Sequence, residues 1–416
     1  MFLTKKKGLI ALTLTLIVSL PSFFTLVNAS PNIEKSNNNF LFDFKIKLFM
    51  KYNRLPSMVF CIIKNNSIAF SKSYGFKNYY LRKKANDDDI YLAGSISKSI
   101  AGSALMQLYD KGFFKLDDNI NKYLPFEIKN PRYPDVNITF RMLLSHQSSL
   151  NDFGIRIRDT SYYLKLAQNN NYSKLLKEML VPGERLYNEI FFSNYKPGEG
   201  TLYCELAIIL AAYLVELFSE QTFEDYCQEH IFKPLEMKNT SFSLIKLDKK
   251  RIAPPYINIG GLLIPLPTYD FKFLDPPAGL WTTTEDLSHY LIAHINNGVY
   301  NNVRILENAT VGLMHTVQYP NSTDKLLGLF FGGNAPMQHG LGWFKLNFSG
   351  KNIEGYTGGA PGYSCHMYTL NFTGVQIGII LLANGPFLYR AAIFGKYTMN
   401  NYNWLFELIY KKVEEL

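Results

Sequence analysis

The sequence predicts one α/β domain, more strictly α+β, in which both ends of the chain contribute strands to a shared sheet. Strand-like runs occur at 58–76 and again at 355–385, and the segment between them is mostly helical. No internal repeat divides the 416 residues, so a single domain is expected. We place the sheet lobe at about 40–90 and 335–416, and the inserted helical lobe at about 91–334.

The first 29 residues have the features of a signal peptide. Three lysines precede the apolar run 8–20, and the small residues at 27–29 predict cleavage after Ala29, which leaves 30–416 as the mature domain. The alternative is an uncleaved anchor formed by 8–27, because that stretch approaches spanning length. A proline and the serine and threonine content favour cleavage, and hence a secreted or lumenal protein.

Two further features bear on export. Glycosylation sequons, in modest excess over chance, occur at Asn65, Asn137, Asn171, Asn239, Asn308, Asn321, Asn347 and Asn371. Export also permits disulfides between the four cysteines, for which three pairings are possible and the spacing selects none. These cysteines are Cys61, Cys204, Cys227 and Cys365.

The elements of the sheet lobe follow in order. Apolar residues at helical intervals predict a buried helix over 39–53. The two strand-like runs within 58–76 are joined by Lys64-Asn65-Asn66, which is typical of a hairpin turn. Near the other end, Gly-rich turns divide 355–385 into three strands, and the amphipathic segment 402–416 predicts a closing helix.

The helical lobe begins at Ser95, where apolar residues start to recur every three or four positions until Gly112. A short helix is expected in 139–149, and 206–218 is apolar throughout, which indicates a buried helix. Thr283 or Thr284 can cap a later helix that ends at Gly298.

Charge and metal-ligand patterns exclude several classes of partner. The formal net charge of +9 is mixed along the chain, with no basic stripe interleaved with aromatic residues, which disfavours nucleic acid. No Cys/His spacing resembles a zinc site, so no metal or other cofactor is expected. The expected partner is a small-molecule or peptide substrate, with a membrane only if the N-terminal segment stays as an anchor.

The stretch "AGSISKSIAG" (93–102) contains the first candidate for chemistry. Ser95 and Lys98 are three residues apart, one turn along the same helix face. The helix N-terminus offers free N–H groups for an oxyanion, and a desolvated lysine can take the proton of a serine nucleophile. Gly94 would allow a substrate to approach closely. The alternative is a capping serine with a solvent-facing lysine, which also suits the other SxxK matches at Ser193, Ser243 and Ser322.

Further motifs follow Ser95 and Lys98 in a fixed order. They are "LLSHQSSL" (143–150), "PGEG" (197–200) leading to Tyr203-Cys204-Glu205, "AGLWTTTEDL" (278–287), "HGLGWF" (339–344) and "YTGGAPGYS" (356–364). Together they resemble the serine β-lactamase and penicillin-binding-protein superfamily. The greatest likeness is to class C β-lactamases, to D-aminopeptidase and D,D-carboxypeptidase relatives, and to β-lactamase-like esterases. The resemblance extends from about residue 40 to residue 416.

This resemblance implies a fold and a set of roles. The fold would be an antiparallel sheet flanked by helices, with a helical lobe. Ser95 would be the acylated nucleophile, Lys98 its proton acceptor, and Tyr203 the phenol that passes the proton to the leaving group. Tyr356-Thr357-Gly358 would form the strand that walls the site, and the backbone N–H groups of Ser95 and Gly359 would form the oxyanion hole.

Two residues depart from the family pattern. Glu205 stands where an asparagine is usual, and a carboxylate facing the site would hold Lys98 protonated and weaken it as a base. A carboxylate facing away would change little. Tyr356 stands where a lysine or histidine is usual, and it brings no positive charge. Both changes make the pocket less cationic, which favours neutral esters or internal amides over a penicillin or a free C-terminal carboxylate.

Other reactive side chains have simpler interpretations. His146 is interpreted as a structural loop residue. Cys204 and Cys365 lie within motifs but are expected to be buried thiols, because no neighbouring residue is placed to activate them. Glu285 and Asp286 are expected to be helix-start charges.

The sequence therefore supports a secreted serine hydrolase that acts through an acyl-enzyme on an ester or amide, esterase- or peptidase-like rather than penicillin-directed. The alternative is a non-catalytic relative with a binding or structural role, which Glu205 and Tyr356 keep open.

Overall fold

The computed structural model describes residues 31–152, 171–270, 276–322, 337–348, 350–385 and 396–416. The chain forms two compact units, Met1–Ile46 and Lys47–Leu416. The predicted signal peptide, its cleavage point and the alternative anchor lie outside the described residues. The sheet and the site described below belong to the second unit.

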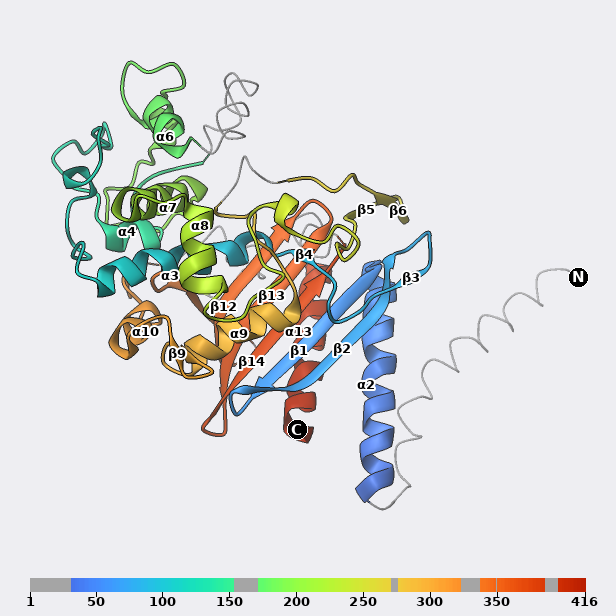
Figure 1. The fold of residues 1–416 in the computed structure, drawn as a ribbon. Coiled ribbons are helices and arrows are strands. Elements are labelled where there is room, and N and C mark those ends of the chain that lie inside the picture. Colours follow the sequence, from blue (N-terminus) through green and yellow to red (C-terminus); the bar gives the residue numbers. More distant parts are fainter. Residues whose placement is uncertain (1–30, 153–170, 271–275, 323–336, 349, 386–395) are drawn as a thin grey trace, which may run out of the picture. The chain divides into compact units, whose positions relative to one another are not determined.

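The second unit contains an eight-stranded sheet whose neighbouring strands all pair antiparallel. The strand order is β10 (Gln338–His339), β11 (Phe344–Phe348), β12 (Lys351–Ala360), β13 (Tyr363–Phe372), β14 (Val375–Ala383), β1 (Ser57–Lys64), β2 (Ser67–Asn78) and β3 (Lys83–Lys84). Strands from both ends of the chain therefore meet, as expected, and they do so at the β14–β1 pair, where Met58 lies opposite Ala383 (Figure 1).

The first hairpin forms where the sequence predicts it. Asn65 and Asn66 both adopt positive φ angles, of 54° and 56°. Two left-handed residues in a two-residue loop match the twist of the flanking strands, and asparagine tolerates this conformation better than most residues. The preceding strand, β1, is apolar and almost wholly buried because it lies between β14 and β2.

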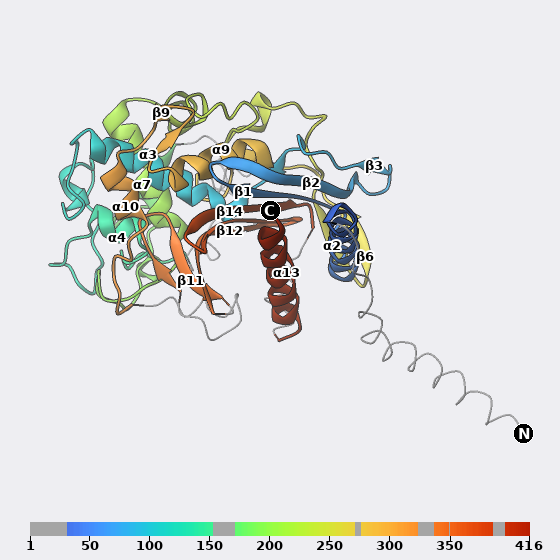
Figure 2. The ribbon, with the colours of Figure 1, turned by 90° about the horizontal axis from the view of Figure 1, so that it is seen from below.

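Helices cover both faces of the sheet. Figure 2 shows α3 (Ser97–Asp110) and α9 (Thr284–Ile295) on one face and α13 (Lys396–Glu415) on the other. Thr283 caps α9 by accepting the N–H of Asp286. Helix α9 packs on β14 and β1, and α3 packs on α7 (Glu205–Ser219) of the helical lobe. The site therefore lies at the junction between the sheet and the helical lobe.

The remaining elements are short. The helical lobe adds α4 (Phe140–Leu144), α6 (Tyr172–Leu180), α8 (Phe223–Cys227), a π-helical turn η6 (Gln228–Phe232) and α10 (Asn308–Met314). The 3₁₀ turns are η2 (Gly94–Ile96), η3 (Ile120–Lys122), η5 (Glu189–Phe191) and η7 (Leu244–Lys246). Three small strand pairs join β4 (Tyr91–Leu92) to β7 (Trp281–Thr282), β5 (Tyr256–Ile259) to β6 (Leu262–Pro265), and β8 (Val299–Tyr300) to β9 (Val303–Arg304).

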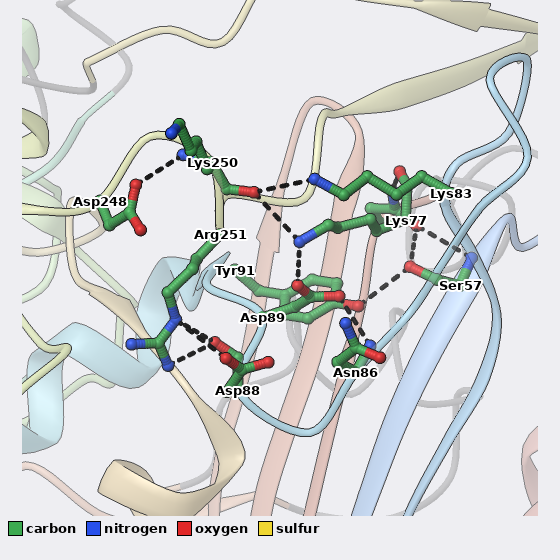
Figure 3. A network of polar contacts seen from close by, with 11 residues as sticks. Ser57, Lys77, Lys83, Asn86, Asp88, Asp89, Tyr91, Asp248, Lys250 and Arg251 are labelled. Carbon is green, nitrogen blue, oxygen red and sulfur yellow. Dashed lines mark hydrogen bonds and ion pairs between the residues drawn. The ribbon is translucent and has the colours of Figure 1, made fainter.

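A buried polar network holds the connection that leads from the sheet to the site (Figure 3). Lys77 of β2 forms a buried ion pair with Asp89, and its ammonium also donates to the carbonyl of Lys250 at 3.1 Å. The hydroxyls of Ser57 in β1 and Tyr91 in β4 lie 3.0 Å apart. Because β4 ends two residues before Gly94, these contacts fix the chain as it enters the Ser95 turn.

Two expectations about the fold are wrong. The helix predicted over 39–53 belongs to α2 (Pro31–Asn53), but it is not buried all round, since Leu48 and Tyr52 are 46% and 62% exposed. The β5–β6 hairpin was missed, although Gly260-Gly261 forms its turn and is a pattern typical of hairpins.

In the part of the chain that the structure describes, no single helix is both long and apolar enough to cross a bilayer. One bent pair, α7 with Phe223–Phe232, meets that test on length and composition alone, with a bend of 78°.

Candidate active site

The Ser95 turn is held by backbone contacts on both sides. Ser95 lies in η2, immediately before α3, and Ala93 donates its N–H to the carbonyl of Leu280 at 2.7 Å. The hydroxyl of Ser97 donates to the carbonyl of Gly94 and accepts the N–H of Leu280 at 3.0 Å. Ser95 is not the cap of α3, since Ile96 occupies that position. The capping interpretation of Ser95 is therefore wrong.

Lys98 directs its ammonium at Ser95 from one turn along the chain. Its Nζ donates to Ser95 Oγ at 2.9 Å, to the carbonyl of Pro277 at 2.9 Å and to Glu205 Oε1 at 3.0 Å. Glu205 Oε2 lies 2.8 Å from the same nitrogen. The lysine side chain is fully buried. An ammonium has three hydrogens, so these three partners satisfy it completely.

Glu205 therefore faces the site, which decides between the two orientations that the sequence left open. It is the first residue of α7, where the free N–H groups of the helix favour a negative charge. Asp152 secures this helix end, because its carboxylate accepts the N–H groups of Glu205 at 2.5 Å and Leu206 at 3.0 Å. Asp152 also accepts from the Cys204 thiol at 3.1 Å.

Burial and charge act in opposite directions on this cluster. Burial lowers the pKa of Lys98, and the nearby Glu205 carboxylate opposes that shift. Burial likewise raises the pKa of Glu205, while Lys98 opposes it. Burial also raises the pKa of Asp152. The net pKa shift of Lys98 is downward, and Glu205 is the group that most opposes the loss of its proton.

Tyr203 completes the cluster around Ser95. The Lys98 ammonium lies 4.7 Å from the centre of the Tyr203 ring. Burial and the charge of Glu205 raise the pKa of Tyr203 well above its usual value. Tyr203 is therefore a protonated phenol in the resting site, and it is suited to give a proton rather than to take one.

Strand β12 lies directly against the Ser95 turn. A Cβ atom on Gly358 would lie 1.7 Å from the carbonyl oxygen of Ala93, so only glycine fits. Gly94, at φ 58°, faces the same strand, and a Cβ atom there would lie 2.8 Å from the nitrogen of Gly359. The glycines thus allow two backbones to meet, rather than a substrate to approach as we expected for Gly94. The predicted oxyanion donors, the N–H groups of Ser95 and Gly359, lie on these two facing segments.

Tyr356 and Thr357 present their side chains to different partners, as successive residues of a strand do. The Tyr356 hydroxyl lies 3.3 Å from His146 Nε2. The Thr357 hydroxyl contacts the hydroxyl of Tyr368 and lies 3.3 Å from His366 Nδ1. Among the described residues, β11 pairs with β12 only as far as Gly355, so the part of β12 that passes Ser95 has no ladder partner in β11.

Sequence reasoning missed two contributors to the site. His146, interpreted as a loop residue, contacts both motif tyrosines, while Asp152 was not singled out at all. The only signal for Asp152 was an acidic residue shortly after the "LLSHQSSL" motif, and the 50 residues that separate it from α7 conceal the contact. Pro277 contributes a carbonyl, which no side-chain pattern reveals.

The other candidates have structural roles. Lys196 and Lys246, of the SxxK matches at Ser193 and Ser243, are largely exposed and pair with surface carboxylates. Cys204 and Cys365 are buried thiols, as expected, and burial raises the pKa of Cys365 to about 12. Asp286 accepts the N–H of Asn239 at 2.6 Å within the first turn of α9. Over the described residues, no group of three or more His, Cys, Asp or Glu side chains is arranged to hold a metal ion.

Comparisons with known proteins agree with this geometry. A family model described as Beta-lactamase matches residues 42–398. Among curated proteins, Protein flp of Staphylococcus aureus (strain MW2) is 25% identical over 283 residues, which is 68% of this chain and 53% of that protein. The chain spans about half the length of the curated relatives it matches.

Solved structures share the fold. An octameric penicillin-binding protein homologue from Pyrococcus abyssi superposes with a TM-score of 0.63 at 23% identity, covering 85% of this chain and 76% of its own. A D-amino acid amidase from Ochrobactrum anthropi SV3, in complex with L-phenylalanine amide, gives a TM-score of 0.66 at 17% identity, covering 90% and 99%. The fold that the motifs imply is therefore confirmed.

Proposed function

This chain belongs to the β-lactamase family, whose members include serine hydrolases, and we propose that it hydrolyses an ester or amide through an acyl-enzyme at Ser95. One observation carries the proposal. Lys98 Nζ lies 2.9 Å from Ser95 Oγ in a buried site that also holds the Tyr203 phenol. A lysine in that position, once neutral, can accept the serine proton as the oxygen attacks.

The proposed reaction has two halves, acylation and deacylation, and Lys98 and Tyr203 transfer protons in both. Ser95 Oγ loses its proton to neutral Lys98 and bonds to the substrate carbonyl carbon, and the oxyanion is stabilised by the N–H groups of Ser95 and Gly359. The bond to the leaving group then breaks as Tyr203 gives that group a proton, and Lys98 afterwards returns a proton to the phenolate. Water attacks the acyl-enzyme, with its proton taken by the same groups, and releases the acid and the free serine.

We propose that the substrate carries no carboxylate near the carbonyl group that reacts. Lys98 is already paired with Glu205, and Tyr356 offers a hydroxyl where relatives carry a cation, so a substrate carboxylate would find no free positive charge among these residues. A penicillin or a free C-terminal peptide is therefore disfavoured.

Localisation is part of the proposal. A secreted or lumenal protein, cleaved after Ala29 and glycosylated at some sequons, accounts for the N-terminal pattern. A membrane protein anchored by 8–27 is the alternative.

A second function is favoured by one observation. Two oxygens of Glu205 lie within 3.0 Å of the lysine nitrogen, which stabilises the protonated form that is inactive as a base. A non-catalytic protein that binds a peptide or glycan, or has a structural role, would tolerate this arrangement.

Labelling by a fluorophosphonate and turnover of a short-chain nitrophenyl ester distinguish the two. The hydrolase predicts labelling and turnover by the wild type and neither by Ser95→Ala. Ser243→Ala is the matched control, because it removes the serine of another SxxK match whose lysine is paired at the surface. A wild type that is neither labelled nor active would exclude the hydrolase, and labelling that survives Ser95→Ala would exclude this nucleophile.

A further inference from the structure

His146 connects the second and third motifs. It follows α4 in a turn where it adopts a φ of 58°, and it is 1% exposed. Its Nδ1 lies 3.2 Å from the backbone nitrogen of Cys204, and its Nε2 lies 3.3 Å from the Tyr356 hydroxyl. Its ring packs 4.6 Å from the ring of Tyr203. One imidazole therefore contacts both tyrosines of the site.

The contact with Cys204 fixes the tautomer. A backbone N–H can only donate, so Nδ1 must be unprotonated to accept it. The single proton of the neutral ring then resides on Nε2, which donates to the Tyr356 hydroxyl. In an imidazolium, the Nδ1–H would face the backbone N–H of Cys204, and two donors cannot form a hydrogen bond with each other. Burial, with the charges of His339 and Lys98, also lowers the pKa of His146 well below its usual value.

A fixed donor at His146 directs the Tyr356 hydroxyl. Because Tyr356 accepts the hydrogen bond from Nε2, its own hydrogen points away from the imidazole. The Tyr356 hydroxyl and the Tyr203 ring both lie against the one imidazole, at 3.3 Å from Nε2 and 4.6 Å between ring centres, so the two tyrosines are neighbours in the site. When Tyr203 gives up its proton to a leaving group, its oxygen becomes negative and needs a hydrogen-bond donor. Lys98 is shared with Glu205 and cannot supply its full charge there.

We propose that His146 is a positioning residue that orients the Tyr356 hydroxyl as a neutral donor to the oxygen of Tyr203 during departure of the leaving group. The inference rests on the proposed function and deepens it. Under this proposal, the uncharged pair of His146 and Tyr356 stabilises the Tyr203 phenolate. In relatives, a cation in the third motif occupies that place. The pair matters most for substrates whose leaving group needs a proton, namely alkyl esters and amides.

Leaving-group chemistry separates this role from a structural one. Nitrophenolate departs without a proton, whereas an alkoxide does not. We expect Tyr356→Phe and His146→Asn to slow hydrolysis of an alkyl ester, mainly in kcat, by roughly tenfold more than they slow turnover of the nitrophenyl ester. Asparagine can keep the acceptor for Cys204 but not the donor to Tyr356. The double variant should be no slower than Tyr356→Phe alone.

Two controls complete the experiment. His146→Gln extends an amide N–H towards Tyr356 and should recover part of the alkyl ester rate. His294→Asn removes another buried histidine, which contacts Ser103 and Trp343 but neither Tyr203 nor Tyr356, and should affect both esters equally or not at all. Equal losses on both esters in His146→Asn would overturn the proposal, as would an unchanged alkyl ester rate.

One measurement does not depend on turnover. Imidazole ¹⁵N shifts, assigned by loss of the signal in His146→Asn, should report a proton on Nε2 and none on Nδ1. An Nδ1–H tautomer would overturn the positioning role even if the wild type proved inactive. Suppose that Ser95 is labelled by the fluorophosphonate and that the ¹⁵N shifts report a proton on Nε2, but that both esters respond equally to the variants. The hydrolase proposal would then stand, and only the role of His146 would be rejected.

Discussion

In the proposed reaction, the pairing of Lys98 with Glu205 sets the reactivity of Ser95. A buried ammonium without partners would lose its proton, whereas here three acceptors satisfy it, one of them a carboxylate. The pair stabilises the charged lysine, and a charged lysine cannot accept a proton from Ser95. At the scale of single residues, the position usually held by asparagine therefore controls how much active base is present.

Glu205→Asn should raise the rate of ester hydrolysis, by about tenfold at neutral pH. Removing the carboxylate takes away the largest influence that opposes burial, although Asp152 remains, so the pKa of Lys98 falls further and a larger fraction of the lysine is neutral. The pH profile of kcat/KM should move towards lower pH, since the base is then available at lower pH. Glu199→Gln, in an exposed ion pair with Lys196, is the control and should change nothing. Identical pH profiles for Glu205→Asn and wild type would contradict this account.

The candidate residues could be found in the sequence because motif order located Ser95, Lys98 and Tyr203. The residues that hold these three in place could not be predicted from the sequence. Asp152 and His146 act through contacts with residues more than 50 positions away, and the sequence contains no local pattern that reports such contacts. The orientation of Glu205 depends on where α7 begins relative to α3, which is a property of packing between elements.

At the scale of elements, the N-terminus of α7 carries the second motif. Tyr203 precedes the helix, Cys204 caps it without a side-chain bond, and Glu205 begins it. Asp152 supplies the missing cap from a distant segment. A charge-assisted bond from a carboxylate to helix N–H groups is stronger than a neutral one. The position of two site residues therefore depends on one external carboxylate.

Asp152→Asn should lower both stability and activity. We expect a loss of about 1–3 kcal/mol in the free energy of unfolding, because the amide group places a donor against the N–H groups of α7. Ester turnover should fall at least about tenfold as Tyr203 and Glu205 shift. Thr283→Ala, which removes the cap of α9, should cost about 0.5–2 kcal/mol but leave turnover unchanged. Urea unfolding and ester assays on both variants test this, and full activity in Asp152→Asn would contradict it.

The other end of α7 predicts a pH-dependent stability. Burial raises the pKa of Glu216 from 4.5 to about 7, although its Oε1 accepts the N–H of Phe223 at 2.9 Å. Between these two pH values the folded chain keeps a proton that the unfolded chain has lost. The contribution of Glu216 to stability is therefore present at low pH and is lost as the pH rises through that window.

Glu216→Gln should remove this loss, because glutamine stays neutral and keeps the acceptor for Phe223. We expect equal urea midpoints at pH 4.5 and a variant more stable than wild type by about 1–2 kcal/mol at pH 8. The neighbouring and exposed Glu220 provides the control through Glu220→Gln. Parallel stability curves across this pH range would show that the carboxyl group is solvated.

Elements with strong local signals were predictable. The Asn65-Asn66 turn, the Thr283 cap and the apolar run of α7 all lie where the pattern places them. Elements whose burial is set by distant packing were not. In α2, the exposure of Leu48 and Tyr52 cannot be told from the spacing of apolar residues alone.

At the scale of the molecule, the four cysteines make a simple prediction. All four are buried and unpaired, and burial raises the pKa of Cys61 to about 12. An Ellman assay without reductant should count four thiols in denaturant and almost none in the native protein. Fewer thiols in denaturant, with the full number restored by reductant, would reveal a disulfide and contradict the arrangement described above.

The pairing of β1 with β14 has a consequence for biosynthesis. Met58 finds its partner Ala383 more than three hundred residues later, so at usual translation rates the β1 edge waits roughly 15–65 s for its neighbour. During that time an apolar strand with an open edge is exposed to other nascent chains. The Ser95 turn emerges early and strand β12 late, so a truncated or stalled chain lacks the wall of the site. The candidate active site is therefore completed only after almost the whole polypeptide has been made.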